Sequence, residues 1–326
     1  MKNRNKIICF GEPLVRFQAL DTHFIDEQHQ LNIYPGGSEA NVAVRLASLG
    51  HQTSFVSLGP DNLIMKEYLS VLASKKVGIQ DFKLKGDRLG TYFLLSPNGL
   101  TKGEVVYDRK YSSFSQLKHE DFDWDNLFED CQLFHWTALT PALSESTAQV
   151  MKKILQKAEE KGVCISVDLN YRNKLWQYGK SPLEVMPKLV EYCDLILGNI
   201  WAESIMLGSP IEESLDIRTP SEKYLDLASE IAHHLFVQFP KAKLIGNTFR
   251  FSKNKNHNFL FGTAHSKQRN ALSDLYETYE LVDRIGSGDA FMAGVISSYL
   301  KGESELEMVN SGIWEAYKKL FIKGDF

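Results

Sequence analysis

The chain has 326 residues, of which 43% are hydrophobic and 24% are charged, so it can bury the core of a large α/β domain. Its formal net charge is −4 and no basic cluster recurs, which argues against nucleic acid as the main partner but leaves room for a small anionic substrate. The cysteines lie far apart and the histidines form no metal-binding pattern. Buried thiols in a reducing compartment are therefore expected, and a structural metal is not. No signal peptide or membrane span follows Met1, which predicts a cytoplasmic protein without a membrane partner.

The first predicted elements are short strands and one helix. Residues 6–11 form an apolar run that predicts a buried strand, and residues 14–34 alternate weakly, which predicts a small strand excursion rather than core. A pair of glycines then precedes the helical spacing of residues 38–50. Ser38 is the expected N-cap of this helix. Asn41 either offers a donor and an acceptor to a sugar hydroxyl or lies solvated on the helix surface.

A hairpin is predicted next, from residues 91–96 and 104–109 around the turn Pro97-Asn98-Gly99. Alternation places three polar or aromatic residues on one face of it, namely Tyr92, Tyr107 and Arg109. The hairpin is either a lid over a polar ligand, in which Arg109 pairs with a carboxylate, or an ordinary half-exposed hairpin.

The second half of the chain alternates strands with helices. This pattern predicts a parallel sheet with helices on both faces and ligands at the carboxyl ends of the strands. The expected strands are 133–136, 163–167, 195–197 and 243–245, and the expected helices are 144–161, 182–192 and 221–235.

Polar residues stand where two of these strands end. Asp168, Asn170 and Arg172 follow one strand at a spacing of two, and Asn199 follows the next. A polar loop would also explain them, but position and composition together favour a functional site.

A Gly-Ser-Gly turn before a C-terminal helix is the strongest candidate for the chemistry. Gly286 and Gly288 let a ligand approach the backbone, and the free N–H groups of the first helical turn would bind an anion such as phosphate. Asp289 in this turn fits a base that takes a proton from an attacking hydroxyl. Alternatively, Asp289 only stabilises the helix as a negative charge in its first turn, and the glycines only form a tight turn.

Two motifs together resemble the signatures of the ribokinase-like (PfkB) carbohydrate kinases. They are the Gly-Gly-x-x-x-Asn pattern of residues 36–41 and the Asp-x-x-Gly-x-Gly-Asp pattern of residues 283–289. Their order, their separation and the strand and helix pattern between them agree, so the resemblance covers essentially the whole chain. Within that family the chain looks most like the 2-keto-3-deoxygluconate kinases, on the features of residues 11–14, 107–109, 168–172 and 282–284.

This resemblance implies a fold and a reaction. The fold would be a single ribokinase-like α/β domain over residues 1–326, with a doubly wound, mostly parallel sheet, helices on both faces, and a small β-sheet lid from about 14–35 and 89–111. The reaction would transfer phosphate from ATP, with Mg²⁺ bridging its phosphates, to a hydroxyl of a sugar acid. Lid sheets of this family often pair between subunits, which implies a homodimer.

The resemblance also assigns roles to individual residues. Asp289 would be the general base, and Gly286, Ser287 and Gly288 would form the anion hole for the transferred phosphate. The nucleotide would be contacted by Asn199, Asn247, Gly286 and Gly288. The sugar acid would be contacted by Gly36, Gly37, Asn41, Tyr92, Tyr107, Arg109, Asp168, Asn170, Arg172 and Asp325.

The chain departs from the family pattern in places. Many relatives carry an Asn-x-x-Glu motif that organises the Mg²⁺ region, whereas Asn199 is followed at that spacing by Ala202 and then by Glu203, so the metal ligands stay unassigned. The segment 246–250 also differs from the commoner nucleotide-side pattern. Relatives usually continue into another loop and helix, so weak order is expected for Asp325 and part of the nucleotide wall is expected to be missing.

Two rival functions follow from the same residues. A fructokinase or another hexose kinase would keep the chemistry, but a neutral hexose would not require Arg109 and Arg172. A non-catalytic sugar-binding protein on the same fold would fit the irregular region around Asn199.

Overall fold

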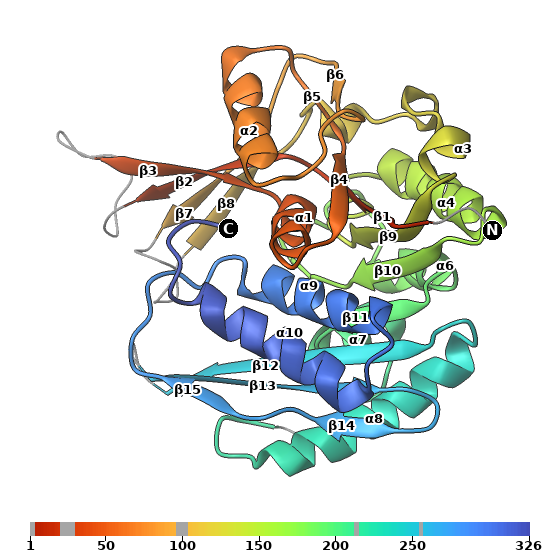
Figure 1. Ribbon diagram of the computed structural model, residues 1–326, viewed down its shortest axis with the longest axis vertical. Coiled ribbons are helices and arrows are strands. Elements are labelled where there is room, and N and C mark those ends of the chain that lie inside the picture. The colour runs from red at the N-terminus through yellow and green to blue at the C-terminus, as the bar shows by residue number, and fades with distance from the viewer. Residues whose placement is uncertain (1–3, 20–29, 96–103, 212–214, 254–256) are drawn as a thin grey trace.

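One large β-sheet forms the centre of the computed structural model, which describes residues 4–19, 30–95, 104–211, 215–253 and 257–326 (Figure 1). Within those residues the sheet has nine strands in the order β14-β13-β12-β11-β10-β9-β1-β4, with β15 beside β13. The strands from β12 to β4 run parallel, as predicted, whereas β13, β14 and β15 run antiparallel to their neighbours. Their bounds are β1 Lys6–Phe10, β4 Gln52–Val56, β9 Cys131–Thr137, β10 Cys164–Asp168, β11 Leu195–Gly198, β12 Leu244–Ser252, β13 Asn258–His265, β14 Asn270–Leu272 and β15 Tyr276–Thr278.

Helices bury both faces of this sheet. Along β1, Ile8 and Phe10 pack into one hydrophobic core and Ile7 and Cys9 into another, because successive side chains of a strand point to opposite faces. The first core is covered by α3 (Trp124–Leu127), α4 (Glu145–Glu160), α6 (Pro187–Val190), α7 (Ile200–Leu207) and α8 (Ser221–Gln238). The second is covered by α1 (Ser38–Ser48), α2 (Leu63–Ser74), α9 (Ser287–Leu300) and α10 (Glu305–Lys319).

The helix predicted over residues 182–192 is wrong as a single element. The structure has α5 (Pro182–Val185) followed by α6, with Met186 between them. Pro187 has no N–H group to continue the hydrogen-bond ladder of α5, so a new helix begins at that residue. Among the described helices, none is both long enough and apolar enough to cross a membrane.

A second, smaller sheet stands beside the carboxyl ends of the central strands (Figure 1). Its order is β3-β2-β7-β8, from β2 (Leu14–Ala19), β3 (Leu31–Gly36), β7 (Gly90–Leu95) and β8 (Glu104–Asp108). The predicted hairpin of β7 and β8 is confirmed, while its turn at 97–99 and the segment 20–29 lie outside the described residues. The shorter elements are β5 (Leu58–Gly59), β6 (Lys83–Leu84) and the 3₁₀ helices η2 (Phe114–Gln116) and η3 (His119–Asp121).

Strand β2 is more deeply buried than the sequence predicted. Arg16, in its middle, has no exposed surface, and it bonds to two aspartates of the C-terminal region. Its Nη2 lies 2.7 Å from Asp283 Oδ2, its Nε lies 3.1 Å from Asp325 Oδ1, and its guanidinium covers the ring of Tyr34 at 4.4 Å. The prediction that residues 14–34 lie outside the core is therefore wrong for β2, because ion partners this distant in sequence leave no local pattern.

Candidate active site

A cavity of about 470 Å³ lies where the lid sheet meets the carboxyl ends of the central strands. Its walls are the ends of β10 and β11, part of β12, the first turns of α1 and α9, and residues of the lid strands. This volume is typical of sites that enclose small molecules. Most of the predicted site residues line it, namely Gly37, Asn41, Tyr92, Tyr107, Arg109, Asp168, Asn170, Arg172, Asn199, Gly286, Ser287, Gly288, Asp289 and Asp325.

Asp289 lies in the first turn of α9, directly on the cavity. Gly286, the N-cap, has a φ of 82°, and a Cβ there would meet the backbone oxygen of Asp325 at 2.3 Å, so glycine is required on both counts. A Cβ at Gly288 would meet nothing within 4 Å. The first turn of α9 therefore presents backbone N–H groups beside a carboxylate.

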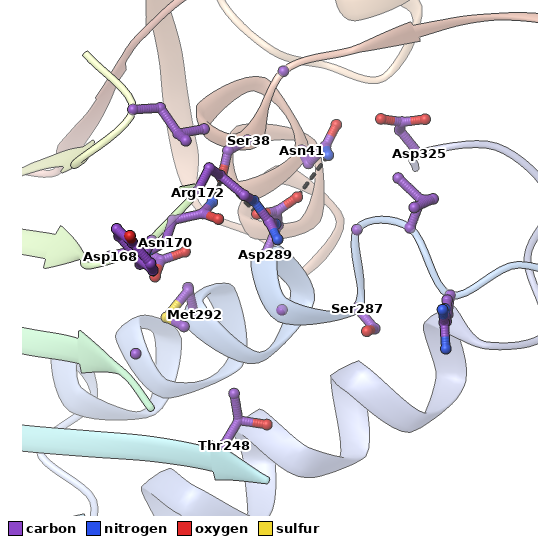
Figure 2. Close-up of a pocket in the computed structure, with 18 of the residues that line it drawn as sticks. Ser38, Asn41, Asp168, Asn170, Arg172, Thr248, Ser287, Asp289, Met292 and Asp325 are labelled. Atoms are coloured by element: carbon purple, nitrogen blue, oxygen red, sulfur yellow. Dashed lines mark hydrogen bonds between the residues drawn. The ribbon is translucent and has the colours of Figure 1, made fainter. Parts of the chain in front are cut away.

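Two side chains of α1 hold the Asp289 carboxylate. Asn41 Nδ2 donates to Oδ2 at 2.7 Å, and Ser38 Oγ donates to Oδ1 at 2.5 Å (Figure 2). Burial raises the pKa of Asp289, while these two hydrogen bonds oppose the rise because they favour the charged form. The two hydrogen bonds therefore fix the orientation of the Asp289 carboxylate.

Ser38 is not the N-cap that the sequence predicted. Gly37 occupies that position with a φ of 124°, and Ser38 is the first residue of α1. Its buried hydroxyl accepts from Asn170 Nδ2 at 3.0 Å while it donates to Asp289. The prediction failed because the partner lies 251 residues away in sequence. A serine directly after the Gly-Gly pair is the only signal that pointed to it.

The segment after β10 supplies the next wall. Asp168 Oδ1 accepts the N–H of Asn170, whose backbone has a φ of 25°. Burial raises the pKa of Asp168 to about 7, and the charge of Asp289 adds to the rise. Arg172 lines the same part of the cavity and acts in the opposite direction on both carboxyl groups. Figure 2 shows these residues on one side of Asp289 and Ser287 on the other.

The lid contributes a wall of aromatic and charged groups. The rings of Tyr92 and Tyr107 lie 6.3 Å apart, and Tyr92 OH donates to Asp325 Oδ2 at 3.1 Å. Asp325 is buried, so the weak order expected for it is wrong: Arg16 and Tyr92 hold it in place. Arg109 also lines the cavity, but its Nε already donates to the buried Glu12 at 2.5 Å.

Two predicted residues lie behind the cavity wall rather than on it. Gly36 is not among the lining residues, and a Cβ there would meet Asp325 Oδ2 at 2.6 Å. Asn247 has no exposed surface and donates to Glu203 Oε1 at 2.6 Å, so the prediction that it contacts a nucleotide is wrong. The buried strand β12 turns this amide toward α7. Asn199 does line the cavity, and it also caps α7 by accepting the N–H of Ala202.

We expect Glu203→Gln to stabilise the protein at pH 8 but not near pH 4. Burial raises the pKa of Glu203 to about 7, whereas a free Glu has a pKa of about 4.3. The folded protein holds this proton more tightly than the unfolded chain, so the group supports folding fully below about pH 4 and loses that support as pH rises to about 7. A gain of up to about 4 kcal/mol at pH 8 is expected from urea unfolding. The control is Glu67→Gln, which replaces an exposed glutamate. An equal gain in stability at both pH values would contradict a raised pKa of Glu203 as the cause.

Two further arginines belong to the site although no role was predicted for them from the sequence. Arg250 on β12 and Arg284 in the loop before α9 both line the cavity. Arg250 lies in the segment 246–250, which differs from the commoner pattern of the family. No local sequence pattern predicted that it lies beside α9.

Magnesium binding by protein carboxylates is not supported by the residues present. Mg²⁺ in phosphate sites is usually held by one or two carboxylates together with phosphate oxygens. Glu203 faces Asn247 inside the protein, and Ala202 stands at the spacing where relatives carry a glutamate. Within the described part of the chain, no cluster of three His, Cys, Asp or Glu side chains suits a metal. On the β12 side of the cavity the charged lining residues are Arg250 and Arg284.

Comparison with known proteins agrees with this geometry. The chain is 26% identical over 322 residues to a 2-dehydro-3-deoxygalactonokinase of Haloferax volcanii, covering 98% of this chain and 92% of that protein. It is 25% identical to a probable chloroplastic fructokinase of Arabidopsis thaliana, covering 92% of this chain and 72% of that protein. The crystal structure of a 2-dehydro-3-deoxygluconokinase from Thermotoga maritima superposes with a TM-score of 0.89 at 30% identity, covering 99% of this chain and 95% of that one.

The predicted ribokinase-like architecture is confirmed by this superposition, including the mostly parallel sheet and the small separate sheet. The model of the family described as "pfkB family carbohydrate kinase" matches residues 4–239, which is more than half of the chain. The chain therefore belongs to the pfkB family of carbohydrate kinases.

Proposed function

We propose that this protein transfers the γ-phosphate of ATP to a hydroxyl of 2-keto-3-deoxygluconate or a closely related sugar acid. One observation carries the proposal: Asp289, in the first turn of α9, has the backbone N–H groups of that turn on one side and Arg172 on the other (Figure 2). Such a site brings together a base, a place for a phosphoryl group and a partner for a carboxylate.

The described residues support a simple route for the transfer. The acceptor hydroxyl lies against Asp289, which takes its proton as the oxygen attacks the γ-phosphorus. The new O–P bond forms as the bond between the γ-phosphorus and the bridging oxygen breaks, and ADP leaves. Backbone N–H groups of the first turn of α9 stabilise the charge on the transferred group. No step is assigned to a magnesium ion held by the protein, because the carboxylates do not fit one.

The choice of a sugar acid rests on charge. Arg172 presents a planar, permanently charged fork to the cavity, which suits a carboxylate better than a neutral hexose. Relatives named for 2-dehydro-3-deoxy sugar acids support this choice, whereas the fructokinase relative supports the rival. The test is ATP consumption by the purified protein with 2-keto-3-deoxygluconate, 2-keto-3-deoxygalactonate, fructose and ribose in turn. Turnover confined to the sugar acids is expected. Turnover on fructose alone would favour the hexose kinase, and no turnover would favour a binding protein.

We expect Ser38→Ala to move the acidic limb of the kcat/KM profile to higher pH. Ser38 donates to the charged form of Asp289, so loss of this hydrogen bond raises the pKa of the base further. The enzyme should then need a higher pH to reach full activity, while the plateau rate changes less. Ser38→Thr, which keeps the hydroxyl, should restore the profile. A uniform loss of rate at every pH would contradict this role.

We also propose that two copies pair through the lid sheet. Both edge strands expose apolar side chains to solvent, with Ile33 of β3 63% exposed and Val106 of β8 46% exposed. Exposed strand edges of this kind are usually covered. Light scattering should report a dimer that Ile33→Glu converts to a monomer. A monomer before the substitution would contradict the pairing.

A further inference from the structure

Three arginines line the cavity, and two of them lie on the side opposite to Asp168 and Asn170. Arg250 reaches this side from β12 and Arg284 from the loop before α9, whereas Arg172, in the segment after β10, lies on the side of Asp168. These three residues come from three separate parts of the sequence, and the fold brings them to one cavity.

Arg250 lies directly over the first turn of α9. Its Nη1 donates to Ser287 Oγ at 2.5 Å and lies 3.5 Å from the backbone oxygen of Arg284. In the described part of the chain no carboxylate forms an ion pair with Arg250. Burial, the charge of Arg284 and the charge of Arg172 all act on the pKa of Arg250. All of them lower it, to about 10, so it stays charged at neutral pH.

The charge of Arg250 is therefore not offset by a carboxylate of the described residues. Like charges repel, and here they are held beside the N–H groups at the positive end of α9. Glu203 of α7 is buried and accepts a hydrogen bond from Asn247, so its carboxyl group does not offset the positive charge of these arginines. A ligand with several negative charges would relieve the repulsion, and a diphosphate or triphosphate is the chemical class that matches it.

We infer that Arg250, together with Arg284, binds the polyphosphate of the donor nucleotide and stabilises the charge of the departing ADP. This inference rests on the proposed function and assigns to arginine side chains the neutralisation that protein-bound metal often provides. Arg172 serves the acceptor, and Arg250 serves the donor. Ser287 orients Arg250 through the hydroxyl that accepts its hydrogen bond.

The test is calorimetric binding of ADP in the presence of EDTA, with no acceptor and no turnover. Arg250→Ala should lower the affinity for ADP about 10- to 100-fold. Arg250→Lys keeps the positive charge but not the forked guanidinium, so it should recover part of the lost affinity. The affinity for AMP, which lacks the second phosphate, should fall less in Arg250→Ala, and the affinity for the sugar acid should not change. The matched control is Arg218→Ala, an arginine with an 87% exposed side chain that pairs with Asp216 in its own turn.

Each outcome decides the assignment. Unchanged ADP affinity in Arg250→Ala, or a loss for the sugar acid instead of ADP, would overturn it. Because binding is measured without turnover, the result is separate from the proposed reaction. Weakened ADP binding in a protein that phosphorylates no sugar would keep the arginine assignment and discard the substrate. Full sugar-acid kinase activity with unchanged ADP affinity would do the reverse. Thermal melting verifies that the variants fold.

Discussion

Asp289→Asn should abolish sugar-dependent ATP hydrolysis and phosphorylation while both ligands still bind. The substitution keeps the shape of the side chain but removes the proton acceptor, and general-base catalysis contributes about 10²- to 10⁴-fold to such reactions. We therefore expect kcat to fall by at least about 10²-fold with little change in the Kd for ADP. Coupled-enzyme kinetics and calorimetry measure the two quantities.

The control for this experiment is Asp61→Asn, which removes an exposed carboxylate that pairs with Lys66. Its kcat should match that of the wild type. Activity of Asp289→Asn within a few-fold of the wild type would exclude Asp289 as the base. Asp168, whose pKa is raised to about 7, would then be the next carboxylate to replace.

The second large effect is expected for Arg172→Ala, and it should depend on the substrate. A hydrogen-bonded pair of a guanidinium and a carboxylate contributes about 1.5–3 kcal/mol, so kcat/KM for 2-keto-3-deoxygluconate should fall about 10- to 100-fold. Any activity on fructose should change little, because fructose has no carboxylate. Arg172→Lys should recover only part of the loss, since a lysine cannot form the two-pronged contact. Equal losses on both sugars would discard the carboxylate argument.

Arg109 cannot serve for the same test. Its Nε is bonded to Glu12, which is buried and also accepts from Ser112. Arg109→Ala would leave that carboxylate without its cation, which typically costs about 3–5 kcal/mol of stability. We expect this variant to melt at lower temperature and to lose activity on every substrate alike.

The sequence predicted the elements that local pattern determines. Alternating apolar runs and helical spacing located the parallel strands, and the rule that ligands bind at strand ends placed Asp168, Asn170 and Arg172 in the cavity. The Gly-Ser-Gly turn before a helix identified Asp289 for the same reason, because the turn and the helix are neighbours in sequence.

Contacts between distant segments escaped prediction. Ser38 is separated from Asp289 by 251 residues and Arg16 from Asp283 by 267, and no periodicity records such pairs. Asn247 shows the converse error. The strand was predicted to end at residue 245, whereas β12 continues through Asn247, and the direction of the Asn247 side chain depends on Glu203 of α7.

The buried contacts of Arg16 restrict how specificity could be redesigned in this enzyme. Transplanting the lid strands from a relative is a natural way to change the sugar that is accepted. A transplanted segment that lacked Arg16 would leave Asp283 and Asp325 buried without their cation, directly beside the turn that begins α9. A chimera would therefore have to exchange the lid and these two aspartates together, although they are far apart in the sequence.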